Sequence, residues 1–393
     1  RVGRTWPNFQ TVDSIAIVGD LLNVPVGVMR FYCLATRKTE EDPNMSLRRS
    51  GRHQLALSRG IMPQKRLEFV DKLGGNVAAY IRRARLPANL FDDPDTWVYY
   101  QSYLKLIHDI AKREGIPDLT FAISDMNIKE AVVPAVTLRL CSAPTLAEAL
   151  RRVNYWGQYQ QTGLRVDTFV SNDTASVLLR LPASVETPGF SISETGSMLL
   201  LLDLCRVYLG NGFKPAMLNL MSRSQDVSYE IEDAYGGVRV QLDSSVSEIR
   251  FPKHLLASVS PFLSSSKEVF PQAPAPLSSP PSKVSDKVKA LLDGYLPDGA
   301  PTLAEMSEIL GVSQRTLQRL LAREDVTYFQ VVDEARCARA LQYLSDCDSN
   351  ACIDDIAHRV GYAERSPFIR SFKRWTSMTP AVYRESRTVQ HTP

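Results

Sequence analysis

Apolar residues recur at helical spacing near the C-terminal end of the chain. In the stretch 361–384 they lie three, four and seven positions apart, which predicts a helix with one apolar face made of Phe368, Ile369, Phe372 and Trp375. The preceding stretch, 353–362, has the same periodicity and then reaches Gly361, a residue that readily takes the left-handed conformation at a helix end. Two helices joined by a short glycine turn predict a helix-turn-helix unit.

The same design appears upstream, in residues 302–324. Its glycine, Gly311, stands 50 residues before the glycine of the other unit. Thr302 and Glu305 form the Thr-x-x-Glu pattern of a capping box, and the next helix has a buried face predicted from Leu317, Leu320 and Leu321. The equivalent cap of the later unit is Cys352 with Asp355. Because Cys is a weaker N-cap than Ser or Thr, we expect that helix to fray more easily.

A third apolar pattern connects the two units. Residues 327–344 repeat an apolar side chain every three positions, which predicts one continuous helix with a face made of Phe329, Val332, Ala335, Ala338, Leu341 and Leu344. About 17 helical residues span roughly 25 Å. Together with the helices at its ends, this length approaches one turn of B-DNA, about 34 Å, so two recognition helices could enter successive major grooves.

The region before these units has mixed patterns. Helical periodicity predicts helices over 64–86, 99–114, 144–160 and 191–210, and alternation predicts strands over 164–170, 175–181 and 237–243. Residues 271–282 contain five prolines and three serines, which is typical of a linker. We therefore divide the chain into a weakly patterned extension (1–61), a mixed α/β domain (62–270), the linker, and an all-α domain (283–387).

Composition and charge limit the classes of function that the chain can have. The net charge is only +3, yet residues 356–387 carry seven Lys or Arg against two Glu, so the cationic surface is local and favours a polyanionic partner. Exposed arginines on amphipathic helices also occur as plain solvated surface, and the paired architecture is what favours DNA. The apolar stretch 197–209 is interrupted by Asp203 and Arg206, so no membrane segment is expected.

The sequence shows few motifs typical of catalytic, metal-binding or disulfide sites. The six cysteines include no Cys-x-x-Cys pair and the five histidines do not cluster with them, so neither a metal site nor a disulfide framework nor a cofactor is indicated. Buried inert thiols and a redox sensor remain alternatives for Cys337, Cys347 and Cys352. The chain lacks the nucleophile-elbow, phosphate-loop, zinc-protease and dinucleotide motifs, so an enzyme is not expected.

Residues 283–387 resemble the DNA-binding domain of the AraC/XylS family of bacterial transcription regulators, and "FKRWTSMTPAVYR" resembles that family's most specific motif. The resemblance implies seven helices. It also implies groove-facing roles for Arg315, Thr316, Gln318 and Arg319 in the first unit and for Arg365, Ser366 and Arg370 in the second. Lys373 and Arg374 lie further from the helix start and are expected to contact phosphate, whereas Arg384 is a candidate structural partner.

The N-terminal part resembles the arabinose-binding-like effector domain of one branch of that family, which includes ornithine-responsive and virulence regulators. The resemblance is carried by "TLAEALRRVNYWGQYQQTG" and "SSVSEIRFPKHLLA". It implies a cytoplasmic, nucleoid-associated regulator whose partners are double-stranded promoter DNA, RNA polymerase, a small-molecule effector and a second copy in a homodimer. The alternative is an N-terminal domain that only oligomerises or binds a protein partner. Tyr155, Trp156 and Tyr159 either line a pocket or pack in a core.

Overall fold

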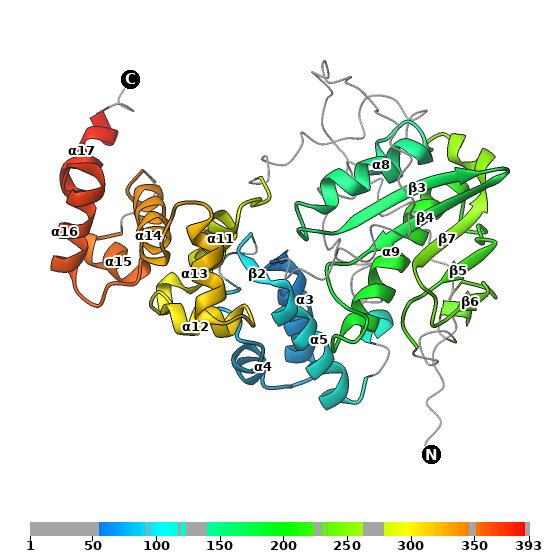
Figure 1. Cartoon of the computed structure of the whole chain (residues 1–393), viewed down its shortest axis with the longest axis horizontal. Coiled ribbons are helices and arrows are strands. Elements are labelled where there is room, and N and C mark those ends of the chain that lie inside the picture. The colour runs from blue at the N-terminus through cyan, green and yellow to red at the C-terminus, as the bar shows by residue number, and fades with distance from the viewer. Residues whose placement is uncertain are drawn as a thin grey trace.

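The computed structural model describes residues 55–91, 93, 95–116, 119–122, 140–223, 229, 231–233, 235–261, 279–345 and 351–389. Residues 1–54 of the predicted extension and residues 271–278 of the predicted linker lie outside the described residues. Figure 1 shows three units in a row: an N-terminal helical unit (55–122) in the middle, an α/β unit (140–261) on one side, and a C-terminal helical unit (279–389) on the other.

Among the described residues of the N-terminal helical unit are a two-stranded antiparallel sheet and the helices α3, α4 and α5. Its elements are β1 (Leu57–Arg59), α3 (Ile61–Lys72), α4 (Val77–Ala84), β2 (Trp97–Tyr99) and α5 (Tyr100–Glu114). The single helical pattern predicted over 64–86 divides into α3 and α4, because Gly74 takes a φ of +76° between them.

Strand β1 corrects the predicted extension. It lies inside residues 1–61, but Leu57 is completely buried, so the weakly patterned extension does not reach residue 61. The prediction was wrong for this stretch because a strand of three residues, all of them buried, shows no alternation of polar and apolar positions.

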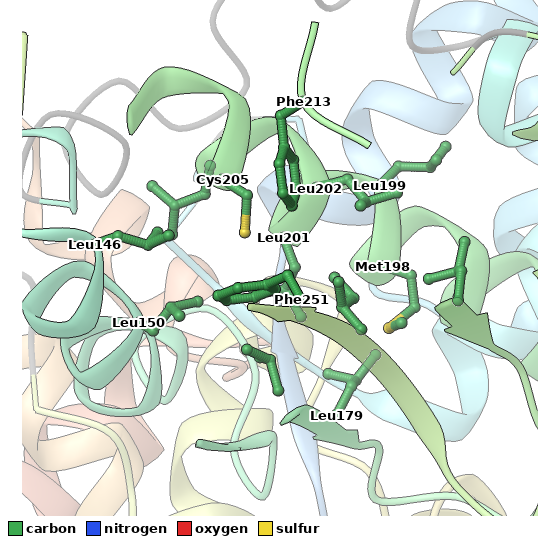
Figure 2. Packing of buried hydrophobic residues seen from close by; sticks show 14 of the residues in the cluster. Leu146, Leu150, Leu179, Met198, Leu199, Leu201, Leu202, Cys205, Phe213 and Phe251 are labelled. Atoms are coloured by element: carbon green, nitrogen blue, oxygen red, sulfur yellow. The ribbon is translucent and has the colours of Figure 1, made fainter. Parts of the chain in front are cut away.

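The α/β unit is built on a five-stranded sheet of order β3-β4-β7-β5-β6. The strands are β3 (Arg165–Ser171), β4 (Thr174–Arg180), β5 (Met217–Asn219), β6 (Val240–Gln241) and β7 (Ser247–Pro252), all antiparallel neighbours except the parallel pair β5 and β6. Helices α8 (Leu146–Gly157) and α9 (Phe190–Leu209) supply the leucines that meet Phe251 and Leu179 of the sheet in one core (Figure 2). The predicted mixed α/β class is confirmed.

The C-terminal helical unit contains seven α-helices in the described residues, as the family resemblance implied. They are α11 (Val284–Tyr295), α12 (Leu303–Ile309), α13 (Gln314–Ala322), α14 (Tyr328–Ser345), α15 (Ile353–Arg359), α16 (Arg365–Thr376) and α17 (Pro380–Val389). Helix α14 confirms the predicted connecting helix between the two helix-turn-helix units.

The predicted apolar face of α14 is wrong in part. Val332, Ala335 and Leu344 are buried as predicted, but Phe329 is 83% exposed and Ala338 is also exposed. The other buried positions are Tyr328, Val331 and Ala340. A repeat of three falls short of the 3.6 residues in a helical turn, so each step moves the side chain about 60° around the helix. Five such steps turn the side-chain direction by about 300° around the helix axis, so the six residues cannot share one face.

The C-terminal helical unit packs directly on the N-terminal helical unit. Leu55, Leu57 and Trp97 of the N-terminal unit share one hydrophobic core with α11, which contributes Val288, Leu291 and Leu292. The approach is close, since a Cβ added to Gly294 of α11 would lie 2.7 Å from Cγ2 of Thr96. Strand β2 therefore lies against α11, although about 190 residues separate them in the sequence (Figure 1).

Arg59 connects the N-terminal helical unit to the α/β unit. Its side chain is only 2% exposed, and its Nε donates to the carbonyl of Tyr159, just after α8, over 2.9 Å. Its Nη1 donates to the carbonyl of Asp95 over 2.7 Å, and the guanidinium carbon lies 4.1 Å from the ring centroid of Trp97. Burial lowers the pKa of Arg59, and the charges of Asp95 and Asp93 oppose that shift. We refer to Arg59 and Trp97 as the Arg59–Trp97 stack.

Asp293 of α11, which lies near Asp93 of the N-terminal helical unit, makes the stability of the folded chain depend on pH. Burial raises its pKa to about 6; Arg339 and Lys289 oppose the rise, and Asp93 adds to it. An unfolded Asp titrates near pH 4, so the folded state holds this proton more tightly than the unfolded state does. Its contribution to stability is therefore full below about pH 4 and is lost as the pH rises through about 6.

We expect Asp293→Asn to raise the free energy of unfolding at pH 7.5 by about 1 to 3 kcal/mol, because it removes a charge that burial disfavours. Urea unfolding at pH 5 and pH 7.5 measures the change. The variant should lose less stability between these two pH values than the unaltered chain does. Asp71→Asn, at an exposed position of α3, is the control. Equal pH dependence of the Asp293 variant and the unaltered chain would contradict the assignment.

Candidate nucleic-acid interface

The first helix-turn-helix unit consists of α12 and α13. The predicted capping box is confirmed: the Thr302 N–H donates to Glu305 Oε2 over 2.7 Å, and the Glu305 N–H donates to Thr302 Oγ1 over 3.2 Å. Gly311 follows α12 with a φ of +62°. A second cap, which the sequence analysis missed, starts α13: Oγ of Ser313 accepts from the Thr316 N–H over 3.1 Å.

Three of the four predicted groove-facing residues of α13 are exposed: Arg315, Gln318 and Arg319. Leu317 and Leu321 are fully buried on the opposite side, which fixes the direction that the arginines face. Thr316 is half-buried, and its hydroxyl lies 2.8 Å from that of Ser313, so it takes part in the cap. Within the described residues, Arg315 and Arg319 form no ion pair and remain available to an anionic ligand.

The second unit consists of α15 and α16. Its predicted capping box is also confirmed, since Sγ of Cys352 accepts from the Asp355 N–H over 3.3 Å and the Cys352 N–H donates to Asp355 Oδ2 over 3.1 Å. The apolar stripe of α16 lies inward as predicted: Phe368 and Phe372 are fully buried, while Ile369 and Trp375 are half-buried.

All five candidate residues of α16, Arg365, Ser366, Arg370, Lys373 and Arg374, are exposed. Two of them have partners within the protein. Nε of Arg365 lies 3.7 Å from Oδ1 of Asp354, and Nη2 of Arg374 lies 2.7 Å from Oδ2 of Asp333 on α14. In the described part of the chain, Arg370 and Lys373 form no ion pair.

Arg384 has the structural role predicted for it. Its Nη2 donates to the carbonyl of Ala351 over 2.8 Å and so fastens α17 to the start of the second unit. The sequence analysis missed the pair between Arg374 and Asp333, because 41 residues separate the partners and no local pattern connects them. This pair holds α16 against α14 and leaves Lys373 as the freer cation at that end of the helix.

The turn of the second unit packs on the backbone near the start of the first. A Cβ added to Gly361 would lie 2.8 Å from the carbonyl oxygen of Leu296 and 3.2 Å from the nitrogen of Ala300. Nη2 of Arg336 on α14 donates to the carbonyl of Gly361 over 3.2 Å, and its guanidinium carbon lies 4.5 Å from the centroid of the Tyr362 ring. These contacts fix the second turn relative to both α14 and the first unit.

The spacing of the two units follows from α14. Its 18 residues span about 27 Å, close to the length that the sequence predicted. The pairs α12–α13 and α15–α16 lie at different ends of this helix (Figure 1). The arrangement can present two cationic helices to one duplex at a fixed separation.

Other candidate groups give little further chemistry. Tyr155, Trp156 and Tyr159 pack on one another with ring centroids 5.0 to 5.6 Å apart, and Tyr155 is 58% exposed, so they form a surface cluster. Cys347 lies outside the described residues, while Cys337 is half-buried and Cys352 exposed. Over the described ranges, no group of His, Cys, Asp and Glu side chains is arranged to hold a metal, and no helix has the length and apolar character needed to span a bilayer.

Two family profiles match the chain. The profile described as "Arabinose-binding domain of AraC transcription regulator, N-term" matches residues 74–259, and the profile described as "Helix-turn-helix domain" matches residues 306–386. Neither family is one of enzymes. The second profile covers the two helix-turn-helix units, and the first covers most of the two N-terminal units.

Three proteins that are similar in sequence to this chain are described as regulators. The HTH-type transcriptional regulator VqsM of Pseudomonas aeruginosa is 30% identical over 202 residues, which are 50% of this chain and 59% of that protein. The HTH-type transcriptional regulator VirS of Mycobacterium tuberculosis is 25% identical over 81% of this chain and 93% of its own length. The ornithine utilization regulator of Pseudomonas aeruginosa is 37% identical over 23% of this chain and 26% of its own length. The chain thus spans less than two thirds of the first of these relatives.

The two turn glycines differ in what surrounds them, and this difference is testable. Both have positive φ, which costs an alanine about 1 to 2 kcal/mol. A Cβ at Gly311 meets nothing within 4 Å, whereas at Gly361 it meets backbone atoms that cannot move aside easily. We expect Gly361→Ala to lower the free energy of unfolding by at least about 2 kcal/mol more than Gly311→Ala does. Urea unfolding of both variants measures this, and equal losses would show that the close approach carries no energetic weight.

Proposed function

We propose that the chain is an AraC-type transcription regulator, which binds promoter DNA through both helix-turn-helix units and controls transcription in response to a small molecule. The observation that supports DNA binding most directly is the pair of cationic helices, α13 and α16, fixed to one connecting helix. Each presents exposed arginines on the side opposite its buried face.

The individual residues have different proposed roles. Arg319 and Arg370 are exposed on the recognition helices and form no ion pair within the described residues, so they are the proposed readers of base edges, together with Arg315 and Gln318. Lys373 is the proposed phosphate contact. Arg374 is less suited to that role than the sequence alone indicates, because Asp333 already binds it at 2.7 Å.

The remaining partners follow from this function. A regulator of bacterial promoters acts in the cytoplasm on the nucleoid, and RNA polymerase is its natural protein partner at a promoter. The N-terminal units are the proposed site of the effector and of contacts in a homodimer. An N-terminal part that only oligomerises or binds a protein partner would leave DNA affinity independent of every small molecule, and this result would distinguish the two functions.

Substitution of the proposed readers tests the assignment. We expect Arg319→Ala or Arg370→Ala to weaken binding to the cognate site by about 1 to 3 kcal/mol and to relax preference at one or two base positions. Affinity for a scrambled duplex should fall much less. Fluorescence anisotropy titrations with both duplexes provide the measurement, and Arg113→Ala, an exposed arginine of α5, is the control. Equal losses on both duplexes would make these arginines phosphate contacts.

Lys373→Ala should behave differently. Because it removes one phosphate contact, we expect binding to every sequence to weaken alike and the slope of log affinity against log salt to shrink by about one. The same titrations at four salt concentrations measure the slope. A slope equal to that of the unaltered chain would remove Lys373 from the interface.

The paired arrangement also predicts the shape of the binding site. One chain should protect two boxes in tandem orientation with centres about 10 base pairs apart, since the two units repeat along one chain and face successive grooves. Hydroxyl-radical footprinting at protein concentrations that give one chain per duplex resolves the boxes. A single short box per chain would contradict the use of both units.

A further inference from the structure

A crevice of about 370 Å³ lies where the N-terminal helical unit meets the first helix-turn-helix unit. One wall comes from the end of α4 and the start of α5, with Arg85, Gln101 and Lys105. The other comes from the end of α12 and the turn that follows it, with Glu308, Leu310 and Gly311. We call this space the seam crevice. Its volume equals that of about a dozen water molecules, enough for a small metabolite.

The charges around the seam crevice favour an anion. Arg85 and Glu308 face each other across the seam, with Nη2 and Oε2 3.1 Å apart, so these two charges compensate each other. Lys105 is exposed and forms no ion pair in the described part of the chain, which leaves one positive charge in excess. A single carboxylate matches this excess, whereas a phosphate monoester would bring nearly two negative charges.

The walls also offer contacts for the body of a small molecule. Ile309, which is half-buried, contributes apolar surface, Gln101 contributes an amide, and a Cβ placed on Gly311 would meet nothing within 4 Å. The space beside the turn is therefore open to a ligand. A molecule in this space would touch the N-terminal helical unit and the turn of the first helix-turn-helix unit at once.

We infer that the seam crevice binds a small monocarboxylate, with the carboxylate held by Lys105 and the body packed against Ile309 and the Gly311 turn. This inference rests on the proposed function, since it locates the effector that the function requires. A ligand that contacts both walls binds the docked arrangement of the two units more tightly than any separated arrangement. Its binding is therefore coupled to the placement of α13, and DNA and the carboxylate change each other's affinity reciprocally.

The test uses the full chain and a series of probes: acetate, butyrate and benzoate, with benzamide as the uncharged counterpart of benzoate. We expect benzoate to raise the melting temperature and to change the dissociation constant for promoter DNA by about fivefold or more, the lower range of allosteric couplings. Benzamide should do neither. Thermal unfolding and DNA titration with and without each probe at equal ionic strength provide the two measurements.

Two lysines of α5 provide the matched variants. Lys105→Ala should abolish both effects of benzoate, and Lys112→Ala, equally exposed but outside the seam crevice, should retain them. The inference is overturned if no carboxylate in the series raises the melting temperature, or if the two variants respond alike. A chain that binds no DNA with or without a probe would instead overturn the proposed function, and the melting temperatures would still report on the crevice.

Discussion

The Arg59–Trp97 stack is the contact on which the relative placement of the three units depends. A guanidinium that is 2% exposed must have its donors satisfied, and here backbone carbonyls from two separate segments accept from it. Trp97, the aromatic partner, also belongs to the core that α11 completes. Arg59 thus connects the α/β unit to the two-stranded sheet, and Trp97 connects that sheet to the first helix of the C-terminal helical unit. Moving the α/β unit away from the sheet would leave a buried guanidinium without its Tyr159 acceptor, which is far costlier than losing an exposed ion pair.

The C-terminal helical unit extends this packing to the two helices that we propose as DNA readers. Because the core shared with α11 continues through Leu317 and Leu321 of α13, the first recognition helix is positioned by the same cluster that holds the N-terminal unit. The second recognition helix is positioned separately: its Phe368 and Phe372 share a core with Ala340 and Leu344 of α14, and Gly361 approaches Leu296 closely. The two helices are thus placed by different contacts, and the first shares its core with the N-terminal part.

Local chemistry explains what could be predicted from sequence. The Thr302 cap and the stripe around Phe372 depend on residues within one or two helical turns, so their patterns are visible without any tertiary information. The prediction that Phe329 is buried is wrong, because residues spaced three apart do not stay on one face of a helix with 3.6 residues per turn. Strand β1 and the burial of Arg59 could not be predicted, since both depend on partners 36 to 105 residues away. The same holds for the seam crevice, whose walls come from segments about 200 residues apart.

The position of β1 and β2 in the chain has a consequence for biosynthesis. These strands leave the ribosome early, whereas α11, which covers them, is translated only after the whole α/β unit. Until then Leu55, Leu57 and Trp97 remain an uncovered apolar surface on the nascent chain. Chaperone occupancy on ribosome-bound chains should therefore persist until α11 has emerged, and chains that end before Val284 carry this surface permanently.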